Sequence, residues 1–239
     1  MPTYFRMRRD GEQVSLTRKG PRGVLITVEG VEGSGKTTQV QRLARLLRAE
    51  GYRVLETREP GGTPLAESIR RTLLQSTDER MDPRCEALLI LAARSQHVAR
   101  VIKPALDEGA IVLCDRFVDS TLAYQGYGRG LDVGLLRRLN RFATGGLEPD
   151  LSLLFDLPIT TGLARRRHNN LEQNRLDRES RRFHTAVRRG FLELAAREPR
   201  RIAVFDGTKS AETLADEVAS IVRRFLRRGG RAIGKPADS

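Results

Sequence analysis

The stretch from Val24 to Arg48 constrains this chain more than any other part of its sequence. A short apolar run, Val24–Val28, comes first, and a glycine-rich turn, Gly30–Thr37, follows it. The apolar residues after the turn repeat at the i, i+3, i+4, i+7 spacing of one helix face: Val40, Leu43, Ala44 and Leu47. The sequence therefore predicts a strand, a turn and a helix in that order. The turn fits G-x-x-x-x-G-K-[ST] at every required position.

This turn predicts a binding site for the phosphates of a nucleoside triphosphate. Glycines let backbone N–H groups approach an anion closely, and the following helix presents its positive end to it. In this motif Lys36 reaches the β- and γ-phosphates, and the Thr37 hydroxyl binds Mg²⁺. A chance glycine-rich turn before an ordinary helix is the alternative, and it leaves the register of glycines, lysine and threonine unexplained. The predicted phosphate-binding residues are Gly30, Val31, Glu32, Gly33, Ser34, Gly35, Lys36 and Thr37.

The formal net charge of +13 is concentrated at the two ends of the chain. Residues 1–23 have a net charge of +4 and residues 223–239 one of +5, which leaves +4 for the 199 residues between them. A nucleic-acid-binding domain carries its basic residues as a patch on the folded body. The distribution therefore argues against that class, except for weak contacts through the basic ends.

The cysteines and the apolar runs indicate the compartment. Cys85 and Cys114 form neither a disulfide framework nor a metal-binding spacing, which fits a reducing environment. The N-terminus has arginines but lacks the apolar segment of a secretory signal. The longest pure apolar run, Ala87–Ala93, is too short to span a bilayer. We expect a soluble cytoplasmic protein with no membrane partner.

Strand-like and helix-like segments alternate along the body of the chain. The expected strands are Val24–Val28, Val54–Thr57, Ala110–Cys114, Leu151–Phe155 and Ile202–Phe205. The expected helices are Lys36–Glu50, Pro64–Leu74, Pro83–Asp107, Val133–Phe142, Ser180–Arg197 and Ala211–Arg227. This order predicts an α/β fold, a parallel five-stranded sheet with helices on both faces. We expect one domain at residues 23–228, after a basic, poorly ordered extension at residues 1–22 and before a tail at residues 229–239.

Charged residues follow the strands at the edge where ligands bind in such a sheet. Arg58 and Glu59 follow the second strand, and Asp115 and Arg116 follow the third. A carboxylate there can hold Mg²⁺ or its water, and a guanidinium can bridge two phosphates. A structural ion pair at a strand end is the alternative for Asp115 and Arg116. Arg94 ends an apolar helical stretch, and its guanidinium can point hydrogen-bond donors into a binding cleft at this edge.

A second cationic segment, at about residues 158–178, is predicted to be a lid. Its arginines are Arg165, Arg166, Arg167, Arg175 and Arg178. A lid that closes over a transferring phosphoryl group needs polar, cationic residues on a mobile segment. The alternative is a solvated helix.

With these motifs assembled, the chain resembles the thymidylate kinases (dTMP kinases) of the bacterial type over about residues 24–225. The motifs that carry the resemblance are VEGVEGSGKTTQ, TREPGGTPLAESIR, LAAR, VIKPAL, CDRFVDSTLAYQGYGRGLD and NRLDRES. The resemblance implies the P-loop kinase fold and usually a homodimer. It also implies transfer of the γ-phosphoryl group of ATP to dTMP, with Mg²⁺, to give dTDP for dTTP biosynthesis.

The resemblance also implies roles for individual residues. ATP would bind at Gly30–Thr37, and the metal residues would be Thr37, Glu59 and Asp115. The residues that would bind dTMP are Glu32, Arg58, Ile90, Arg94, Arg116, Thr121, Tyr124 and Gln125. The residues that would act in catalysis are Lys36, Asp115, Arg116, Arg165, Arg166, Arg167 and Arg175. Some members carry an arginine inside the phosphate loop, where this chain has Gly33 and Ser34, so the lid would supply that charge.

Ile90 departs from the family pattern, because relatives commonly have a phenylalanine there that stacks on thymine. The acceptor phosphate is already an anion and a nucleophile, so we name no general base, and catalysis would be positioning and charge neutralisation. Two other hypotheses stay open. One is a kinase for a different small deoxynucleotide or nucleoside. The other is a catalytically weak nucleotide-binding protein whose basic ends bind nucleic acid.

Overall fold

The computed structural model describes residues 4–7, 13–16, 22–75, 80–168, 175–176 and 178–228. The central feature is a parallel sheet of five strands in the order β4-β5-β3-β6-β7. Its strands are β3 (Val24–Gly30), β4 (Val54–Arg58), β5 (Ile111–Asp115), β6 (Leu151–Asp156) and β7 (Ile202–Asp206). All five expected strands and the parallel α/β class are confirmed.

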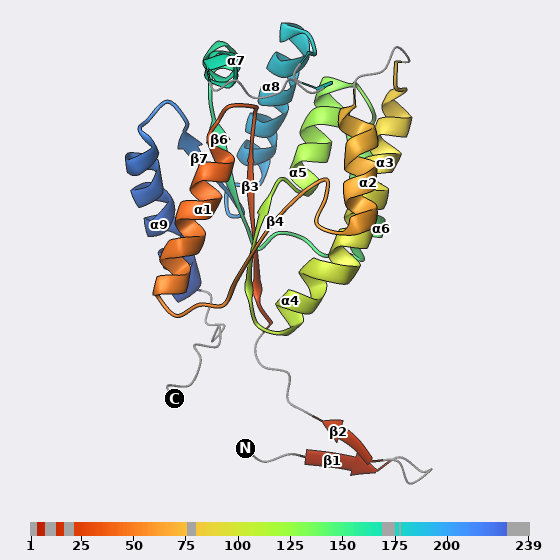
Figure 1. Ribbon diagram of the computed structural model, residues 1–239, viewed down its shortest axis with the longest axis vertical. Coiled ribbons are helices and arrows are strands. Elements are labelled where there is room, and N and C mark those ends of the chain that lie inside the picture. Colours follow the sequence, from red (N-terminus) through yellow and green to blue (C-terminus); the bar gives the residue numbers. More distant parts are fainter. Residues whose placement is uncertain are drawn as a thin grey trace.

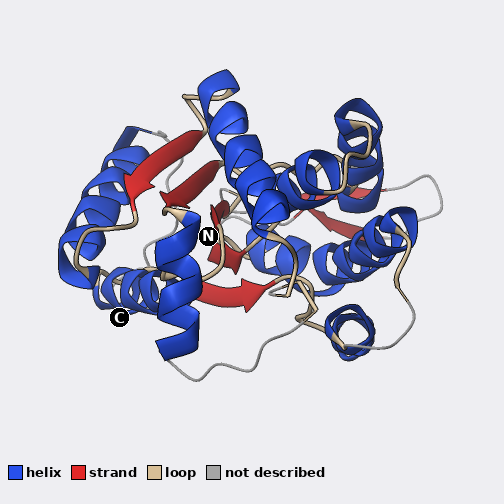
Figure 2. Cartoon of the chain, turned by 90° about the horizontal axis from the view of Figure 1, so that it is seen from above, coloured by secondary structure: helices blue, strands red, loops and turns tan. Residues whose placement is uncertain are grey.

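Helices cover both faces of this sheet (Figures 1 and 2). The longer helices are α1 (Lys36–Ala49), α2 (Pro64–Leu74), α3 (Pro83–His97), α6 (Val133–Thr144), α7 (Ile159–His168), α8 (Arg181–Arg197) and α9 (Ala211–Arg228). The shorter ones are η1 (Val98–Ile102), α4 (Lys103–Asp107), α5 (Val118–Thr121) and η2 (Leu122–Gly128), and η1 and η2 are π-helical. Within the described residues, no helix is long and apolar enough to cross a membrane.

Alternate residues of the central strand β3 point to opposite faces, and each face has its own core. Ile26 and Val28 pack with the apolar stripes of α1 and α9, on the left of Figure 1. Leu25 faces the opposite side and packs with residues of η1 and α4. This burial on both faces is why the strand reads as a continuous apolar run rather than an alternating one.

The structure differs from the expected helices in three places. One is α7 (Ile159–His168), which lies in the segment predicted to be a lid and was not among the expected helices. The helix expected at residues 83–107 is interrupted by a π-helical segment, η1, between α3 and α4. The helical stretch α5–η2 was not expected at all. Its residues from Asp119 to Gly126 are all buried, so it lacks the polar face that gives an amphipathic period. The sequence there looked like a binding motif rather than a helix.

The N-terminal extension contains some regular structure. Two short strands, β1 (Tyr4–Met7) and β2 (Gln13–Leu16), pair antiparallel with each other and are not part of the five-stranded sheet. The expectation for residues 1–22 was a basic, poorly ordered extension, and it stays a prediction. The tail at residues 229–239 lies outside the described residues.

Candidate active site

The phosphate loop lies between β3 and α1, and its shape depends on three glycines. Gly30, Gly33 and Gly35 have φ values of 139°, 74° and 86°, which L side chains rarely adopt. A Cβ on Gly33 would lie 2.2 Å from the carbonyl oxygen of Gly162 in α7. The loop and the start of α7 therefore touch through their backbones, which leaves no room for a side chain at position 33.

Lys36, the first residue of α1, is buried inside this loop. Its Nζ donates to the carbonyl oxygens of Val31 at 2.8 Å and Gly30 at 3.1 Å. Burial, and then the nearby Arg116 guanidinium, lowers the pKa of Lys36 to about 8. An ammonium that is desolvated in this way gains from a bound polyanion, because the anion adds opposite charge directly beside it.

Thr37 and Asp115 come together from α1 and β5. The Thr37 hydroxyl donates to Oδ2 of Asp115 at 2.9 Å. The other carboxylate oxygen, Oδ1, is buried and has no hydrogen-bond partner among the described residues. A hydroxyl and a carboxylate with a free oxygen are the hard oxygen ligands that Mg²⁺ prefers. The predicted pair therefore forms a donor set that fits Mg²⁺.

Arg116 follows β5 and lies against the phosphate loop. Its guanidinium donates to the carbonyl oxygen of Gly30 at 3.1 Å and forms an ion pair with Glu32. The Tyr124 hydroxyl donates to the same Glu32 carboxylate at 2.8 Å, and the Arg116 guanidinium lies 5.0 Å from the centre of the Tyr124 ring. Glu32, Arg116 and Tyr124, predicted from three separate motifs, thus form one cluster.

A pocket of about 80 Å³ adjoins this cluster. Eight of the predicted site residues line it: Glu32, Glu59, Ile90, Arg94, Arg116, Thr121, Tyr124 and Gln125. The remaining lining residues are Pro60, Arg70, Ser120 and Leu176. Because Glu32 belongs to the phosphate loop and Arg116 touches it, the pocket lies where an acceptor can meet a phosphoryl donor.

Arg94 is buried and held by protein partners. Nε donates to Glu59 at 2.6 Å, and Nη1 donates to Thr121 Oγ1 at 2.7 Å and to Asn140 Oδ1 at 2.5 Å. Nη2 donates to the carbonyl oxygen of Phe117 at 3.0 Å. We expected a donor fork free to enter a cleft, whereas these bonds use four of the five guanidinium hydrogens.

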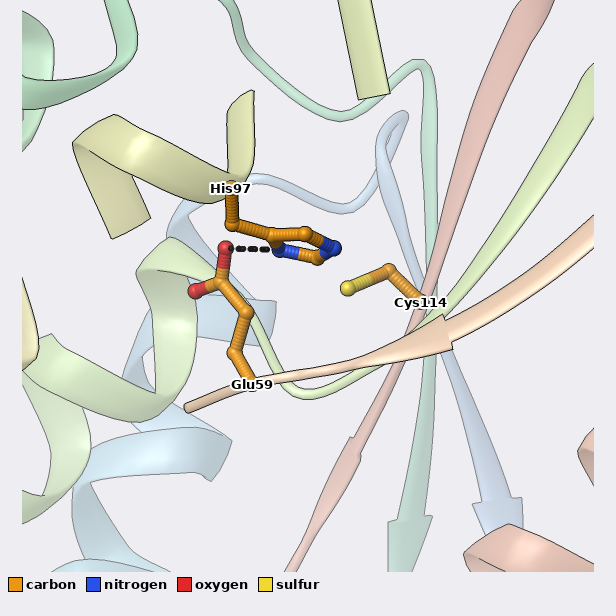
Figure 3. Close-up of side chains that lie close together, drawn as sticks. All are labelled: Glu59, His97 and Cys114. Atoms are coloured by element: carbon orange, nitrogen blue, oxygen red, sulfur yellow. Dashed lines mark hydrogen bonds and ion pairs between the residues drawn. The ribbon is translucent and has the colours of Figure 1, made fainter. Parts of the chain in front are cut away.

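Glu59, His97 and Cys114 lie close together under this arginine, and their ligand-type atoms are all within 4.8 Å of one another (Figure 3). The His97 Nδ1 is 3.0 Å from Glu59 Oε1, and its Nε2 is 2.7 Å from the Thr57 hydroxyl. The Cys114 thiol donates to the carbonyl oxygen of Arg116, and burial raises its pKa well above the usual value. Glu59 and His97 are therefore hydrogen-bonded to each other, Cys114 bonds separately to the backbone, and a metal-binding thiolate is disfavoured.

Two predicted acceptor residues have other contacts. Arg58 does not line the pocket, because its exposed guanidinium forms an ion pair with Glu67. Gln125 lines the pocket, but its amide nitrogen donates to Glu86 at 2.7 Å.

Two of the lid arginines, Arg165 and Arg175, contact the protein. Arg165 Nη1 donates to the carbonyl oxygen of Gly207, at the end of β7, at 2.9 Å. Arg175 forms an ion pair with Glu86 at 2.6 Å and donates to the Leu73 carbonyl oxygen. The side chains of Arg166 and Arg167 lie outside the described part of the chain.

Sequence reasoning missed several residues of this region. Arg70 lines the pocket and has no carboxylate partner among the described residues, and its side chain donates to the Pro60 carbonyl oxygen. Arg70 ends the motif TREPGGTPLAESIR, so its position was the available signal. His97 and Asn140 had none, because neither belongs to a motif that predicts a site. Glu86 is a further buried carboxylate, paired with both Arg129 and Arg175.

Comparison with known proteins identifies the family that this geometry belongs to. The family model described as Thymidylate kinase matches residues 28–218. The chain belongs to the thymidylate kinase family. A thymidylate kinase from Geobacter sulfurreducens is 54% identical over 205 residues, covering 84% of this chain and 96% of the relative. One from Thermomicrobium roseum is 54% identical over 207 residues, covering 87% of this chain and 98% of that protein.

A solved structure agrees with the thymidylate kinase assignment. The crystal structure of thymidylate kinase from Ehrlichia chaffeensis superposes with a TM-score of 0.68 at 36% identity, covering 84% of this chain and 99% of that one. The resemblance in the motifs is thereby confirmed at the level of family and of fold.

Proposed function

We propose that this chain transfers the γ-phosphoryl group of ATP to dTMP through the pocket and phosphate loop described above. The chain is an ATP-dependent phosphotransferase of the thymidylate kinase family, whose members phosphorylate dTMP to dTDP. The observation that supports the proposal is that the phosphate loop and the acceptor pocket share residues. Glu32 belongs to the phosphate loop and lines the acceptor pocket, and Arg116 contacts both.

On the donor side, backbone N–H groups of Gly30–Thr37 would bind the β- and γ-phosphates. Lys36 would leave the loop carbonyls and neutralise these phosphates, which restores a partner to its desolvated charge. Mg²⁺, when bound, would draw charge from the phosphate oxygens. Thr37 and Asp115 would hold it, since they supply a hydroxyl and a free carboxylate oxygen. Glu59 is a weaker candidate for this role, because both its oxygens already accept hydrogen bonds from Arg94 and His97.

On the acceptor side, two arginines of the pocket would hold the dTMP phosphate in line with the donor. Arg116 would bridge the two nucleotides, and Arg70 would bind the acceptor phosphate, because it is a pocket cation without a carboxylate partner among the described residues. Arg94 and Thr121 would recognise the base, Ile90 would pack on it, and Tyr124 would contact the sugar. Gln125 would assist from the pocket wall, and Arg58 would act only after leaving Glu67.

The lid would supply the arginine that the phosphate loop lacks. Arg165, Arg166, Arg167 and Arg175 are the candidates, since a side chain cannot fit at Gly33. For Arg175 this role requires release from Glu86. A lid cation of this kind would neutralise charge on the phosphoryl group mainly in the transition state.

We also propose a cytoplasmic homodimer. Four of the six large exposed apolar residues in the described part of the chain lie on three neighbouring helices: Leu65 on α2, Leu88 on α3, and Leu135 and Phe142 on α6. An apolar surface of this kind fits a second copy of the chain better than water. The free cysteines, Cys85 and Cys114, fit a reducing compartment. Any nucleic acid binding would be weak and confined to the basic ends.

An acceptor panel tests the proposed function. Purified protein, ATP and Mg²⁺ are incubated with dTMP, dUMP, dCMP, dAMP, dGMP and thymidine in separate reactions, and nucleotide products are separated by ion-exchange chromatography. We expect dTMP to have the highest kcat/KM. Preference for another acceptor would support the hypothesis of a different nucleotide kinase. DNA-stimulated ATP hydrolysis without acceptor phosphorylation would support the nucleotide-binding alternative.

A further inference from the structure

The acceptor pocket contains a guanidinium whose position is fixed by partners from three other segments of the chain. Arg94 comes from α3, and its partners are Glu59 after β4, Thr121 in α5, the Phe117 carbonyl before α5, and Asn140 in α6. Because four of its five hydrogens are used, Arg94 retains one Nη2 hydrogen for a ligand. Recognition by Arg94 therefore depends on where that single donor points.

Asn140 is a buried polar residue of α6. Its side chain is 4% exposed, and its Oδ1 accepts from Arg94. Its Nδ2 is buried and has no hydrogen-bond partner among the described residues. A buried amide with an unpaired donor lowers stability, so its presence requires another explanation. The contact with Arg94 provides one.

His97 holds Glu59, the partner of Arg94 Nε, from the other side. The ring is fully buried, with Nδ1 at 3.0 Å from Glu59 Oε1 and Nε2 at 2.7 Å from the Thr57 hydroxyl (Figure 3). Glu59 as a carboxylate can only accept, so Nδ1 carries the hydrogen and Nε2 accepts from Thr57. Glu59 is thus fixed by His97 through one oxygen and fixes Arg94 through the other.

We propose that Asn140 and His97 are positioning residues for base recognition, and that they aim the one free donor of Arg94 into the acceptor pocket. This inference rests on the proposed function. Neither residue lines the pocket, so each acts through Arg94 or Glu59. Without Asn140, one Nη1 hydrogen of Arg94 is unpaired, and without His97, Oε1 of Glu59 is unpaired. In both cases Arg94 gains rotational freedom. Affinity for the acceptor and discrimination between bases then fall, while the ATP site is unaffected.

The first test compares Asn140→Leu with Asn140→Asp. Aspartate keeps an acceptor for Arg94 Nη1, whereas leucine has a similar volume and no acceptor. We expect Asn140→Leu to raise KM for dTMP about tenfold, the cost of one lost hydrogen bond to a charged group, and to leave KM for ATP unchanged. The preference for dTMP over dCMP should fall by a similar factor. Asn140→Asp should retain both wild-type values.

Two controls separate positioning from a general loss of structure. Thr144→Val changes another buried polar residue of α6 that does not touch Arg94, and it should leave KM for dTMP unchanged. His97→Leu should give the same signature as Asn140→Leu, while His97→Asn, whose amide replaces the Nδ1 donor, should retain more of the dTMP affinity. If Asn140→Leu does not fold, Asn140→Ser is the substitute, because its shorter side chain loses the bond to Arg94 with a smaller change in polarity. The same changes in KM are expected for it.

The outcomes distinguish this inference from the proposed function. Wild-type protein that does not phosphorylate dTMP would refute the proposed function. Active wild type with equal KM for dTMP in Asn140→Leu and Asn140→Asp would overturn the positioning role. So would a parallel rise of KM for ATP and dTMP, or a fall in melting temperature with unchanged dTMP-to-dCMP preference, because either result indicates a structural role alone.

Discussion

At the scale of single residues, Arg116 is where the donor and acceptor sides of the site meet. It has a φ of 69°, and it is the one non-glycine residue with positive φ in the described part of the chain. Such a conformation costs about 1–3 kcal/mol and persists only where neighbouring contacts impose it. Here the Arg116 N–H donates to the Val28 carbonyl oxygen, and the guanidinium contacts Gly30 and Glu32. The strain is thus located at the residue proposed to bridge the two nucleotides.

Lys36 predicts a pH-dependent uptake of protons when ATP binds. Its pKa is lowered to about 8, so about half of the free protein has a neutral amine at pH 8. The triphosphate favours the charged form and raises this pKa, so binding at pH 8 should take up about half a proton, and binding at pH 6 almost none. Titration calorimetry in two buffers of different ionisation enthalpy measures the uptake. If the binding heats at pH 8 were the same in both buffers, no proton would be taken up, which would contradict a Lys36 pKa lowered by burial.

Because position 90 is isoleucine, we predict that the protein binds the base more weakly than a variant with phenylalanine there. It lines the pocket, as the prediction for this helix required. An aromatic pair is worth about 0.5–1.5 kcal/mol beyond its buried area, or about threefold to tenfold in affinity. Ile90→Phe should therefore lower KM for dTMP a few-fold with kcat about unchanged. Steady-state kinetics with dTMP and dUMP, beside melting temperatures, check this. An equally stable variant with unchanged KM would show that Ile90 does not face the base.

At the scale of elements, the sequence predicted the strands and the amphipathic helices, but it did not predict the helical stretch α5–η2, whose residues are buried on every side. Strands and amphipathic helices followed from period and from glycine punctuation. The strand ends gave Glu59 and Arg116, which line the pocket, and Asp115, which accepts from Thr37. The α5–η2 stretch escaped because it has no exposed face. The partners of Arg94 escaped because they come from three segments other than its own, and no sequence spacing relates Asn140 to Glu59. The sequence indicated candidate site residues, but it did not indicate which hydrogen bonds these residues form with one another.

The contact between α7 and the phosphate loop predicts a sensitive position in the lid. A Cβ on Gly162 would lie 2.3 Å from the Glu32 carbonyl oxygen, so Gly162→Ala must push α7 away from the loop. A displacement of about 1 Å near the reacting groups costs about 10²-fold in rate, so we expect kcat to fall by that order with a small change in melting temperature. Thr160→Ala, an exposed position of the same helix, is the matched control and should keep wild-type kcat. If the Gly162→Ala variant kept the wild-type kcat, the position of α7 against the phosphate loop would have no effect on catalysis, which contradicts this prediction.

At the scale of the whole molecule, the exposed apolar residues of α2, α3 and α6 predict a homodimer. Leu88 is 59% exposed, and a charge there should oppose burial against a second copy. Leu88→Glu should therefore halve the mass that light scattering records after size exclusion. Val204→Glu, at a 50% exposed apolar residue of β7, is the control and should leave the mass unchanged. A wild-type protein that elutes as a monomer at all concentrations would refute this interface.

The central claim is that one connected site passes a phosphoryl group directly from ATP to dTMP. The most direct measurement follows the label of [γ-³²P]ATP in the presence of Mg²⁺ and dTMP, with wild-type protein and with Lys36→Met, which keeps the buried aliphatic stem and lacks the charge. The account predicts that wild type transfers the label to the β-position of dTDP and that Lys36→Met, although folded, does not. Label that appears only as inorganic phosphate, or equal transfer by the two proteins, would contradict it.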